Sequence, residues 1–171
     1  VVPVLRDTGA ADFFVAHWSE VPAVCRHVPA GSIAVLHGPV HAEDAGFARA
    51  SGVRPVINSL HQAQLWIDSG GGPCDLMVDT GINRLGLPLD ALADPLVSKL
   101  EINTLLSHLA SADEDVAQNA RQLAAFKDAA RRVPAKWRSL ANSAGIVLGG
   151  NYAFDLTRPG IALYGGVPRP E

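Results

Sequence analysis

Polar side chains that could do chemistry follow several apolar runs of this sequence, at the point where each run ends. His108 comes directly after one such run, and Asp79 ends another, with Arg84 five residues beyond it. The full set of polar residues at the ends of runs, or just beside one, is His17, His37, Asn58, Asp79, Arg84, His108, Asn142, Ser143 and Arg158. If the runs are parallel strands of a barrel, these side chains gather on one rim, where barrel enzymes place their sites.

Two arginines in this set, Arg84 and Arg158, have few basic neighbours in the sequence. A guanidinium group matches carboxylate and phosphate oxygens, so two of them on one rim indicate an anionic ligand. Ser143-Ala144-Gly145 and Gly160-Ile161 could add backbone N–H groups, and Ser143 a hydroxyl, which bind phosphate without a lysine. Any one of these residues could be only a cap or a turn residue, so it is their convergence that favours a ligand site.

Several other classes of site are disfavoured. His37 and His41 have a metal-like spacing, but no Cys or acidic ligand completes the set, so we expect no metal. Neither a GxxxxGK[ST] nor a GxGxxG motif follows a strand, which argues against nucleotide binding. A net charge of -3 without a basic cluster argues against nucleic acid, and no apolar run approaches the ~20 residues that span a bilayer. Cys25 and Cys74 form no CxxC pair, which suits a reducing compartment such as the cytoplasm.

The elements that must position these residues are short apolar runs separated by segments of helical period. The seven predicted strands are residues 12–17, 32–37, 54–58, 75–79, 102–108, 138–142 and 160–164. The runs are nearly continuous in apolar character, which is typical of parallel strands covered on both faces. The pattern fits either a doubly wound sheet or a (β/α)₈ barrel, and seven strands favour a partial barrel whose first strand is missing.

Two serines mark expected helix starts, because Ser59 and Ser111 each stand three residues before Gln or Glu. The second start predicts the clearest helix, with an apolar face made of Val116, Ala120, Leu123, Phe126 and Ala130. We expect one domain over residues 1–171, and the absence of an initiator Met at Val1 predicts that it is truncated.

Four segments, in order, resemble motifs of the alanine racemase family. They are Met77-Val78-Asp79-Thr80-Gly81-Ile82-Asn83-Arg84-Leu85-Gly86, Ser107-His108-Leu109-Ala110-Ser111-Ala112-Asp113-Glu114, Ala141-Asn142-Ser143-Ala144-Gly145 and Arg158-Pro159-Gly160-Ile161-Ala162-Leu163-Tyr164-Gly165. The resemblance spans essentially the whole chain. It implies the pyridoxal 5′-phosphate (PLP)-binding N-terminal barrel domain of that family, truncated at both ends.

The resemblance also implies roles for single residues. Catalytic roles fall to Arg84, His108 and Arg158. Arg158 would donate to the pyridine nitrogen of PLP, with His108 supporting it, and Arg84 would reach the phenolic oxygen. Ser143, Gly160 and Ile161 would hold the phosphate. The implied reaction is the interconversion of L- and D-alanine, an isomerase activity that supplies D-alanine to peptidoglycan of the bacterial cell wall, in a cytoplasmic homodimer.

The sequence departs from the family pattern at two places. Met77 stands where the family usually carries a lysine, often carbamylated and bonded to the arginine. Lys99, Lys127 and Lys136 all lie away from the predicted rim, so we expect the lysine that links covalently to PLP, and the tyrosine that acts as second base, to be absent and the fragment inactive. A racemase of broader specificity and a PLP-carrying regulatory barrel without turnover are the two alternatives.

Overall fold

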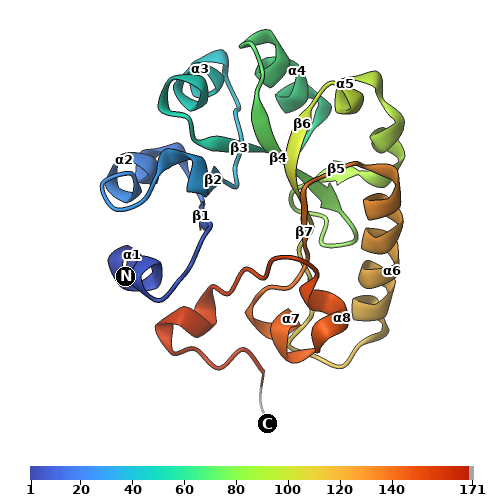
Figure 1. Cartoon of the computed structure of the whole chain (residues 1–171). Helices are drawn as coiled ribbons and strands as arrows, with labels where there is room; N and C mark the ends of the chain where they lie inside the picture. The colour runs from blue at the N-terminus through green and yellow to red at the C-terminus, as the bar shows by residue number, and fades with distance from the viewer. Residues whose placement is uncertain (170–171) are drawn as a thin grey trace. The chain divides into compact units, whose positions relative to one another are not determined.

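The structure, a computed structural model, describes residues 1–169, in which short strands alternate with helices (Figure 1). Contacts divide the chain into two compact units. The first comprises Val1–Asp75 and Asp94–Glu101, and the second comprises Leu76–Ala93 and the residues from Ile102 onward. Within residues 1–169, no helix combines the length and apolar character that crossing a membrane requires.

The first unit holds three parallel strands, β1 (Phe13–Val15), β2 (Ile33–Val35) and β3 (Arg54–Ile57). β2 pairs with both of the others, with Phe13 opposite Ile33 and Ala34 opposite Arg54. Every residue of β2 and β3 is buried. The prediction of buried parallel strands from continuous apolar runs is therefore confirmed in this unit.

Helical segments connect these strands. They are α1 (Val2–Asp7), η1 (Trp18–Glu20), α2 (Val21–Val24), η2 (Ala30–Ser32), α3 (Ala42–Ser51), α4 (Leu60–Asp68) and α5 (Pro95–Ser98). Ser59 caps α4 as predicted, because its hydroxyl accepts the N–H of Gln62 at 3.2 Å. The Gln62 side chain accepts the N–H of Asn58 at 2.7 Å, one residue before the expected partner.

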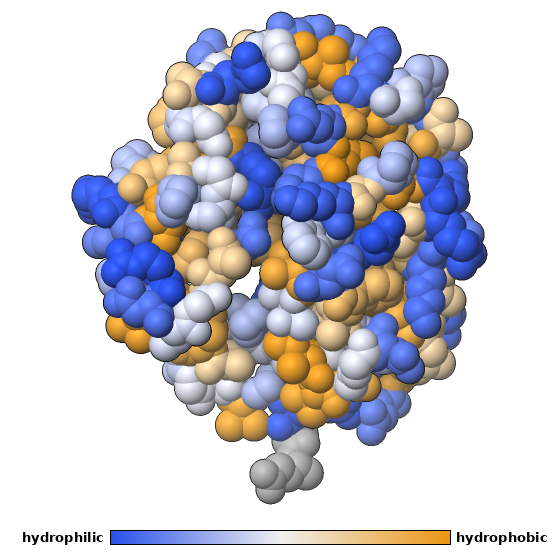
Figure 2. Space-filling model, viewed as in Figure 1, coloured by the Kyte–Doolittle hydropathy of each residue, from blue (hydrophilic) through white to orange (hydrophobic). Residues whose placement is uncertain are grey.

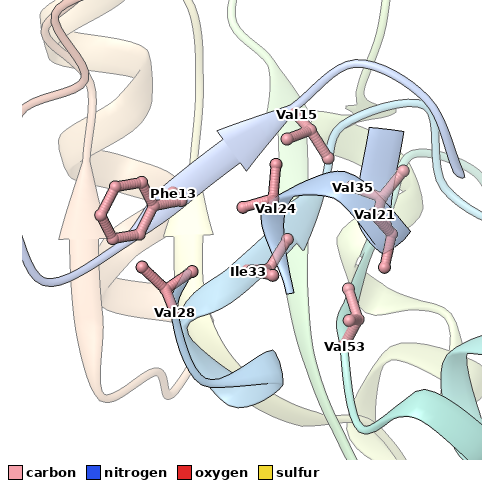
Figure 3. Packing of buried hydrophobic residues seen from close by; sticks show 8 residues of the cluster. All are labelled: Phe13, Val15, Val21, Val24, Val28, Ile33, Val35 and Val53. Atoms are coloured by element: carbon pink, nitrogen blue, oxygen red, sulfur yellow. The ribbon is translucent and has the colours of Figure 1, made fainter. Parts of the chain in front are cut away.

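An apolar cluster forms the core of the first unit, and Figure 3 shows its side chains gathered around β1, β2 and the short helix α2. Its members are Phe13, Val15, Val21, Val24, Val28, Ile33, Val35 and Val53. Most of them are β-branched, so they lose little side-chain freedom when they pack against strands. The cluster fixes α2 against the strands whose carboxyl ends carry His17 and His37.

A buried ion-pair network lies beside this core. Arg54, with 7% of its surface exposed, places Nη2 2.6 Å from Oδ1 of Asp12 and Nε 3.3 Å from Oδ1 of Asp75. Asp75 has no exposed surface. The guanidinium also donates to the carbonyl of Gly31. Because both charges of a buried pair have lost their water, removing either one would leave the other uncompensated inside the protein.

The second unit contains most of β4 (Pro73–Asp79), together with β5 (Leu87–Pro88), β6 (Glu101–Leu106) and β7 (Trp137–Ser139). β6 lies between β4 and β7, and β5 pairs with the end of β4. The pairings of β5 with β4 and of β7 with β6 are parallel. Its helical segments are η3 (Leu89–Ala93), α6 (Ala117–Arg132), α7 (Ser143–Val147), α8 (Gly150–Ala153) and η4 (Ile161–Tyr164).

The seventh predicted strand, residues 160–164, is wrong. This segment forms the 3₁₀ helix η4, in which Leu163 donates its N–H to the carbonyl of Gly160 at 3.0 Å. A strand needs a neighbour to satisfy its backbone groups, and here local bonds and the Ser143 hydroxyl satisfy several of them instead. The two-residue strand β5 was not predicted.

The predicted start and face of the longest helix also need correction. α6 begins at Ala117, and Ser111 closes a turn by accepting the N–H of Glu114 at 3.1 Å. The buried positions of α6 are Asn119, Gln122, Phe126 and Ala129, so only Phe126 of the predicted apolar face is fully buried. Hydrophilic residues cover the outer side of α6 at the right of Figure 2. The side-chain amides of Asn119 and Gln122 therefore lie on the buried side of α6, which was predicted to be apolar.

Replacing Arg54 with alanine should lower the free energy of unfolding by about 3 kcal/mol or more, because Asp75 would remain buried without this counterion. Urea unfolding of both proteins measures the difference. Arg131→Ala is the matched control, since it removes an exposed pair with Asp128 at 2.8 Å and should cost less than ~1 kcal/mol. Equal losses in the two variants would contradict the importance of the buried network.

Candidate functional site

The loop that leaves β4 is organised by the carboxylate of Asp79. One oxygen, Oδ1, accepts three consecutive backbone N–H groups, those of Gly81 at 2.8 Å, Ile82 at 3.0 Å and Asn83 at 3.2 Å. These bonds turn the chain sharply and present Arg84 as an exposed residue at the loop's outer part. Asp79 therefore stabilises the backbone of the loop, and the exposed Arg84 side chain is available to a ligand.

Gly86 closes the same loop, because the chain returns there to form β5. Its φ is +118°, and an added Cβ would lie 2.6 Å from the backbone nitrogen of Asp79 and 2.7 Å from the carbonyl carbon of Val78. Backbone atoms cannot move aside as a flexible side chain can, so only glycine fits. The close approach holds both ends of the loop that carries Arg84.

His108 follows β6 and is fixed by Asn142, the N-cap of α7. The side-chain oxygen of Asn142, Oδ1, accepts the N–H of Gly145 at 2.9 Å, which sets the orientation of the side-chain amide. Its nitrogen therefore faces Nε2 of His108 at 3.3 Å and the carbonyl of Leu109 at 3.3 Å. Because an amide nitrogen can only donate, Nε2 accepts, and the proton of neutral His108 lies on Nδ1.

The surroundings of His108 keep its ring uncharged. Burial lowers the pKa of His108 from its ordinary 6.5 to about 4, with further lowering by the positive charges of Arg158 and then Arg84. The two arginines thus lie close enough to His108 for their charges to act on it. At neutral pH the site holds two cations and a neutral imidazole that can exchange a proton.

Arg158 reaches the ends of β6 and β7. Its guanidinium donates to the hydroxyl of Ser139 and to the carbonyl of Ser107, two residues with no exposed surface. Its backbone N–H donates to the carbonyl of Ala141 at 2.9 Å. An arginine held in this way keeps a fixed direction, and its N–H groups can only donate to whatever lies in front of them.

The hydroxyl of Ser143 lies against the residues that follow Arg158. The hydroxyl of Ser143, which is 5% exposed, accepts the N–H of Gly160 at 2.8 Å and that of Ala162 at 3.3 Å. Ile161 lies between these two donors and is 60% exposed. Both N–H groups thus already have an acceptor, and the hydroxyl hydrogen of Ser143 is the donor that this group can offer to a phosphate oxygen.

The polar residues at the strand ends of the first unit form a separate group. The rings of His17 and His37 lie 5.3 Å apart between centroids. The amide nitrogen of Asn58 donates to the carbonyls of Leu36 at 2.9 Å and Val56 at 3.0 Å, so it ties strand ends together. Across residues 1–169, no group of three or more His, Cys, Asp or Glu side chains is arranged to hold a metal.

Sequence reasoning missed Gln122, which is 1% exposed and bonded to both loops of the site. Its amide nitrogen donates to the carbonyl of His108 at 3.0 Å and to Oγ1 of Thr80 at 3.3 Å. Its amide oxygen accepts the N–H of Ala110 at 2.9 Å. The available signal was its position four residues before Phe126, which puts both on one helix face.

The family model described as "Alanine racemase, N-terminal domain" matches residues 1–168. The chain belongs to this family. It is 42% identical to alanine racemase of Brucella ovis over 183 residues, which covers 100% of this chain and 46% of that protein. With alanine racemase of Acidiphilium cryptum it shares 40% identity, over 99% of this chain and 50% of the relative.

Solved structures agree with this assignment. A structure of alanine racemase from Bartonella henselae with covalently bound pyridoxal phosphate matches with a TM-score of 0.86 and 38% identity, over 97% of this chain and 52% of that one. Biosynthetic alanine racemase from Pseudomonas aeruginosa matches with a TM-score of 0.89 and 30% identity, over 100% and 50%. The fold is therefore that of the alanine racemase barrel domain, and the chain spans about half the length of these relatives.

The lowered pKa of His108 predicts a pH dependence of stability. Between pH 6.5 and 4 the unfolded chain binds a proton that the folded chain resists, so the free energy of unfolding falls as pH falls. A shift from 6.5 to about 4 corresponds to a loss of about 2 kcal/mol at pH 5 relative to pH 7.5.

Urea unfolding at the two pH values, with the wild type and His108→Asn, measures this contribution. The variant should lose about 2 kcal/mol less than the wild type on going to pH 5, whereas His27→Asn, at an exposed histidine, should keep the wild-type pH dependence. An unchanged pH dependence in His108→Asn would refute a neutral buried His108.

Proposed function

We propose that the protein containing this chain is a PLP-dependent alanine racemase, and that these residues form the part of it that grips the cofactor ring and phosphate. The observation that carries the proposal is the pair formed by Arg158, which is directed by Ser139 and Ser107, and the neutral His108 near it. Membership of the family adds support, as does the PLP bound covalently in the Bartonella henselae relative.

The residues present fit the three polar features of PLP. The hydroxyl of Ser143 can donate to a phosphate oxygen, and the N–H groups of Gly160 and Ala162, which bond that hydroxyl here, would lie beside the phosphate with Ile161 in the same turn. A guanidinium that can only donate suits an unprotonated pyridine nitrogen, which is an acceptor. The exposed Arg84 suits the negatively charged phenolic oxygen.

PLP, when bound, supplies the electron sink that lets the Cα proton of an amino acid leave and return. Arg158 keeps its own proton and so leaves the ring nitrogen uncharged, which makes the sink weaker. With a weaker electron sink, the time between the loss of the Cα proton and its replacement would be short. The neutral His108 beside Arg158 supports this state, because it adds no positive charge near the ring.

Met77 stands at the family's lysine position and is 4% exposed within β4. It cannot carry a charge, so we assign the orientation of Arg84 to the loop itself. The bonds from Asp79 and the close approach at Gly86 restrict the loop backbone, and Gln118 of α6 donates to the carbonyl of Gly81 at 2.9 Å. Under this proposal, five contacts of the loop backbone take the place of one side-chain partner of Arg84.

The three lysines of this chain do not form the covalent link to PLP under this proposal. Lys99 follows α5, Lys127 lies on α6, and Lys136 stacks its ammonium 5.4 Å over the ring of Trp137. All three are exposed. The linking lysine, and the tyrosine that serves as the second acid and base, are assigned to other parts of the complete protein.

The cellular role follows as part of the same proposal. The enzyme would supply D-alanine to peptidoglycan from the cytoplasm, as a homodimer. A racemase of broader specificity differs only in the amino acids that it accepts, so a substrate panel separates the two. A PLP-carrying regulatory barrel would bind the cofactor and show no turnover with any amino acid.

Reversing the charge of the side chain that would face the ring nitrogen tests the proposal directly. Arg158→Glu in the complete protein would favour a protonated ring nitrogen, so alanine racemisation should fall on the order of 100-fold while transamination to pyruvate rises. Measuring D-alanine and pyruvate in the same reaction gives the ratio. Arg121→Glu, the same change at an exposed position of α6, should leave it unaltered, and an unaltered ratio in Arg158→Glu would overturn the assignment.

A second test locates the covalent link. Borohydride reduction of the PLP-loaded complete protein, followed by peptide mass mapping, should find no PLP adduct at Lys99, Lys127 or Lys136. Stoichiometric labelling of any of the three would show that the chain supplies its own linking lysine. That result would contradict the assignment of the linking lysine to another part of the complete protein.

A further inference from the structure

Gln122 is the one side chain of α6 that contacts both the loop after β4 and the loop after β6, among the hydrogen bonds of the described residues. Its nitrogen bonds the carbonyl of His108 and the hydroxyl of Thr80, and its oxygen bonds the N–H of Ala110. Both ends of the amide are in use at a position that is 1% exposed. A leucine would fill the same volume, but it would leave these buried polar groups without this partner.

The contacts continue from Gln122 toward Arg158. The hydroxyl of Thr80 lies 2.8 Å from that of Ser107, and the carbonyl of Ser107 accepts from the Arg158 guanidinium. Thr80 also begins the loop in which Arg84 stands. The amide of Gln122 therefore bonds directly to His108 and to the loop that carries Arg84, and it reaches Arg158 through Thr80 and Ser107.

We propose that Gln122 is a positioning residue that sets the mutual placement of Arg84, His108 and Arg158, and through them the choice between racemisation and side reactions. The inference rests on the proposed racemase function for its activity readout. Its structural content stands separately, because it concerns how two loops of one unit are held together.

The donors and acceptors around position 122 explain why an amide is needed there. The carbonyl of His108 requires a donor, the N–H of Ala110 requires an acceptor, and the Thr80 hydroxyl can bond with either. A glutamine supplies both from one planar group, whereas a carboxylate can only accept and an apolar side chain does neither. Substitutions can therefore remove the donor alone or the whole bonding capacity.

The experiment compares Gln122→Glu and Gln122→Leu in the complete protein. Gln122→Glu keeps the acceptor for Ala110 but loses the donor to the His108 carbonyl, so the carboxylate and this carbonyl oxygen should repel each other and shift the loop that carries His108. A displacement of a positioned group on the scale of 1 Å can cost on the order of 100-fold in rate. We expect kcat for alanine racemisation to fall 10-fold to 100-fold, KM to change less than about 3-fold, and the fraction of transamination to rise.

Amide hydrogen exchange gives a readout that needs neither cofactor nor turnover. The N–H of Ala110 should exchange at least about 10-fold faster in Gln122→Leu, which removes its acceptor, and should stay protected in Gln122→Glu. The N–H groups of residues 81–83 should exchange faster in Gln122→Leu, because a leucine cannot bond the Thr80 hydroxyl.

Asn119 provides the matched control. It lies three residues earlier on α6, is 4% exposed, and donates to the carbonyl of Glu114 at 2.8 Å, outside the site. Asn119→Asp and Asn119→Leu impose the same chemical changes on a buried amide of the same helix. Both should lower stability without changing the transamination fraction or exchange at residues 81–83.

The outcomes separate the two proposals. A wild-type protein that neither binds PLP nor racemises any amino acid rejects the racemase, while the exchange data still test the role of Gln122 in holding the loops. An active wild type whose Gln122→Glu variant keeps kcat and transamination fraction, and whose Gln122→Leu variant keeps the exchange at residues 81–83, refutes the positioning role. Equal shifts in the Asn119 variants would also refute it, since they would show general loosening of α6.

Discussion

The direction of the Arg158 guanidinium depends on two serines that have no contact with solvent. Ser139 and Ser107 stand at or just beyond the ends of β7 and β6, where their polar atoms have lost water and need partners inside the protein. Arg158 supplies those partners, and in return its charged group is held by neutral oxygens. The same charge, with the burial of His108, keeps that imidazole uncharged. The orientation of the arginine thus depends on this buried polar contact, and its charge adds to the effect of burial on His108.

Much of this arrangement could be predicted from the sequence, because strand ends are marked by a change from apolar to polar residues. Six predicted strands are confirmed, whereas the cofactor-binding roles of Arg158 and Ser143 stay predictions. The error at residues 160–164 has a physical cause: β-branched and aromatic residues favour a strand only where another strand is available to pair with them. In the described structure the N–H groups of Gly160 and Ala162 bond to Ser143 instead.

The buried face of α6 could not be predicted from the sequence. Periodicity locates the buried face of a helix by assuming that buried means apolar. In α6 the amides of Asn119 and Gln122 occupy that face, because the loops beside them carry backbone groups that need donors and acceptors. The polar residues that share a helix face with the buried Phe126 were therefore the ones that mark the buried face. The placement of Arg84 relative to His108 likewise depends on tertiary bonds that no local pattern records.

The short strand β5 has a consequence for the entropy of ligand binding. Parallel strands are usually joined by a dozen or more residues, yet Leu87 returns to pair with Val78 after a loop of only residues 80–86. Both ends of that loop are anchored in one sheet, so most of its backbone freedom is lost when the chain folds. An anion that meets Arg84 then encounters a loop already ordered. The free energy of that contact goes into affinity rather than into ordering the chain.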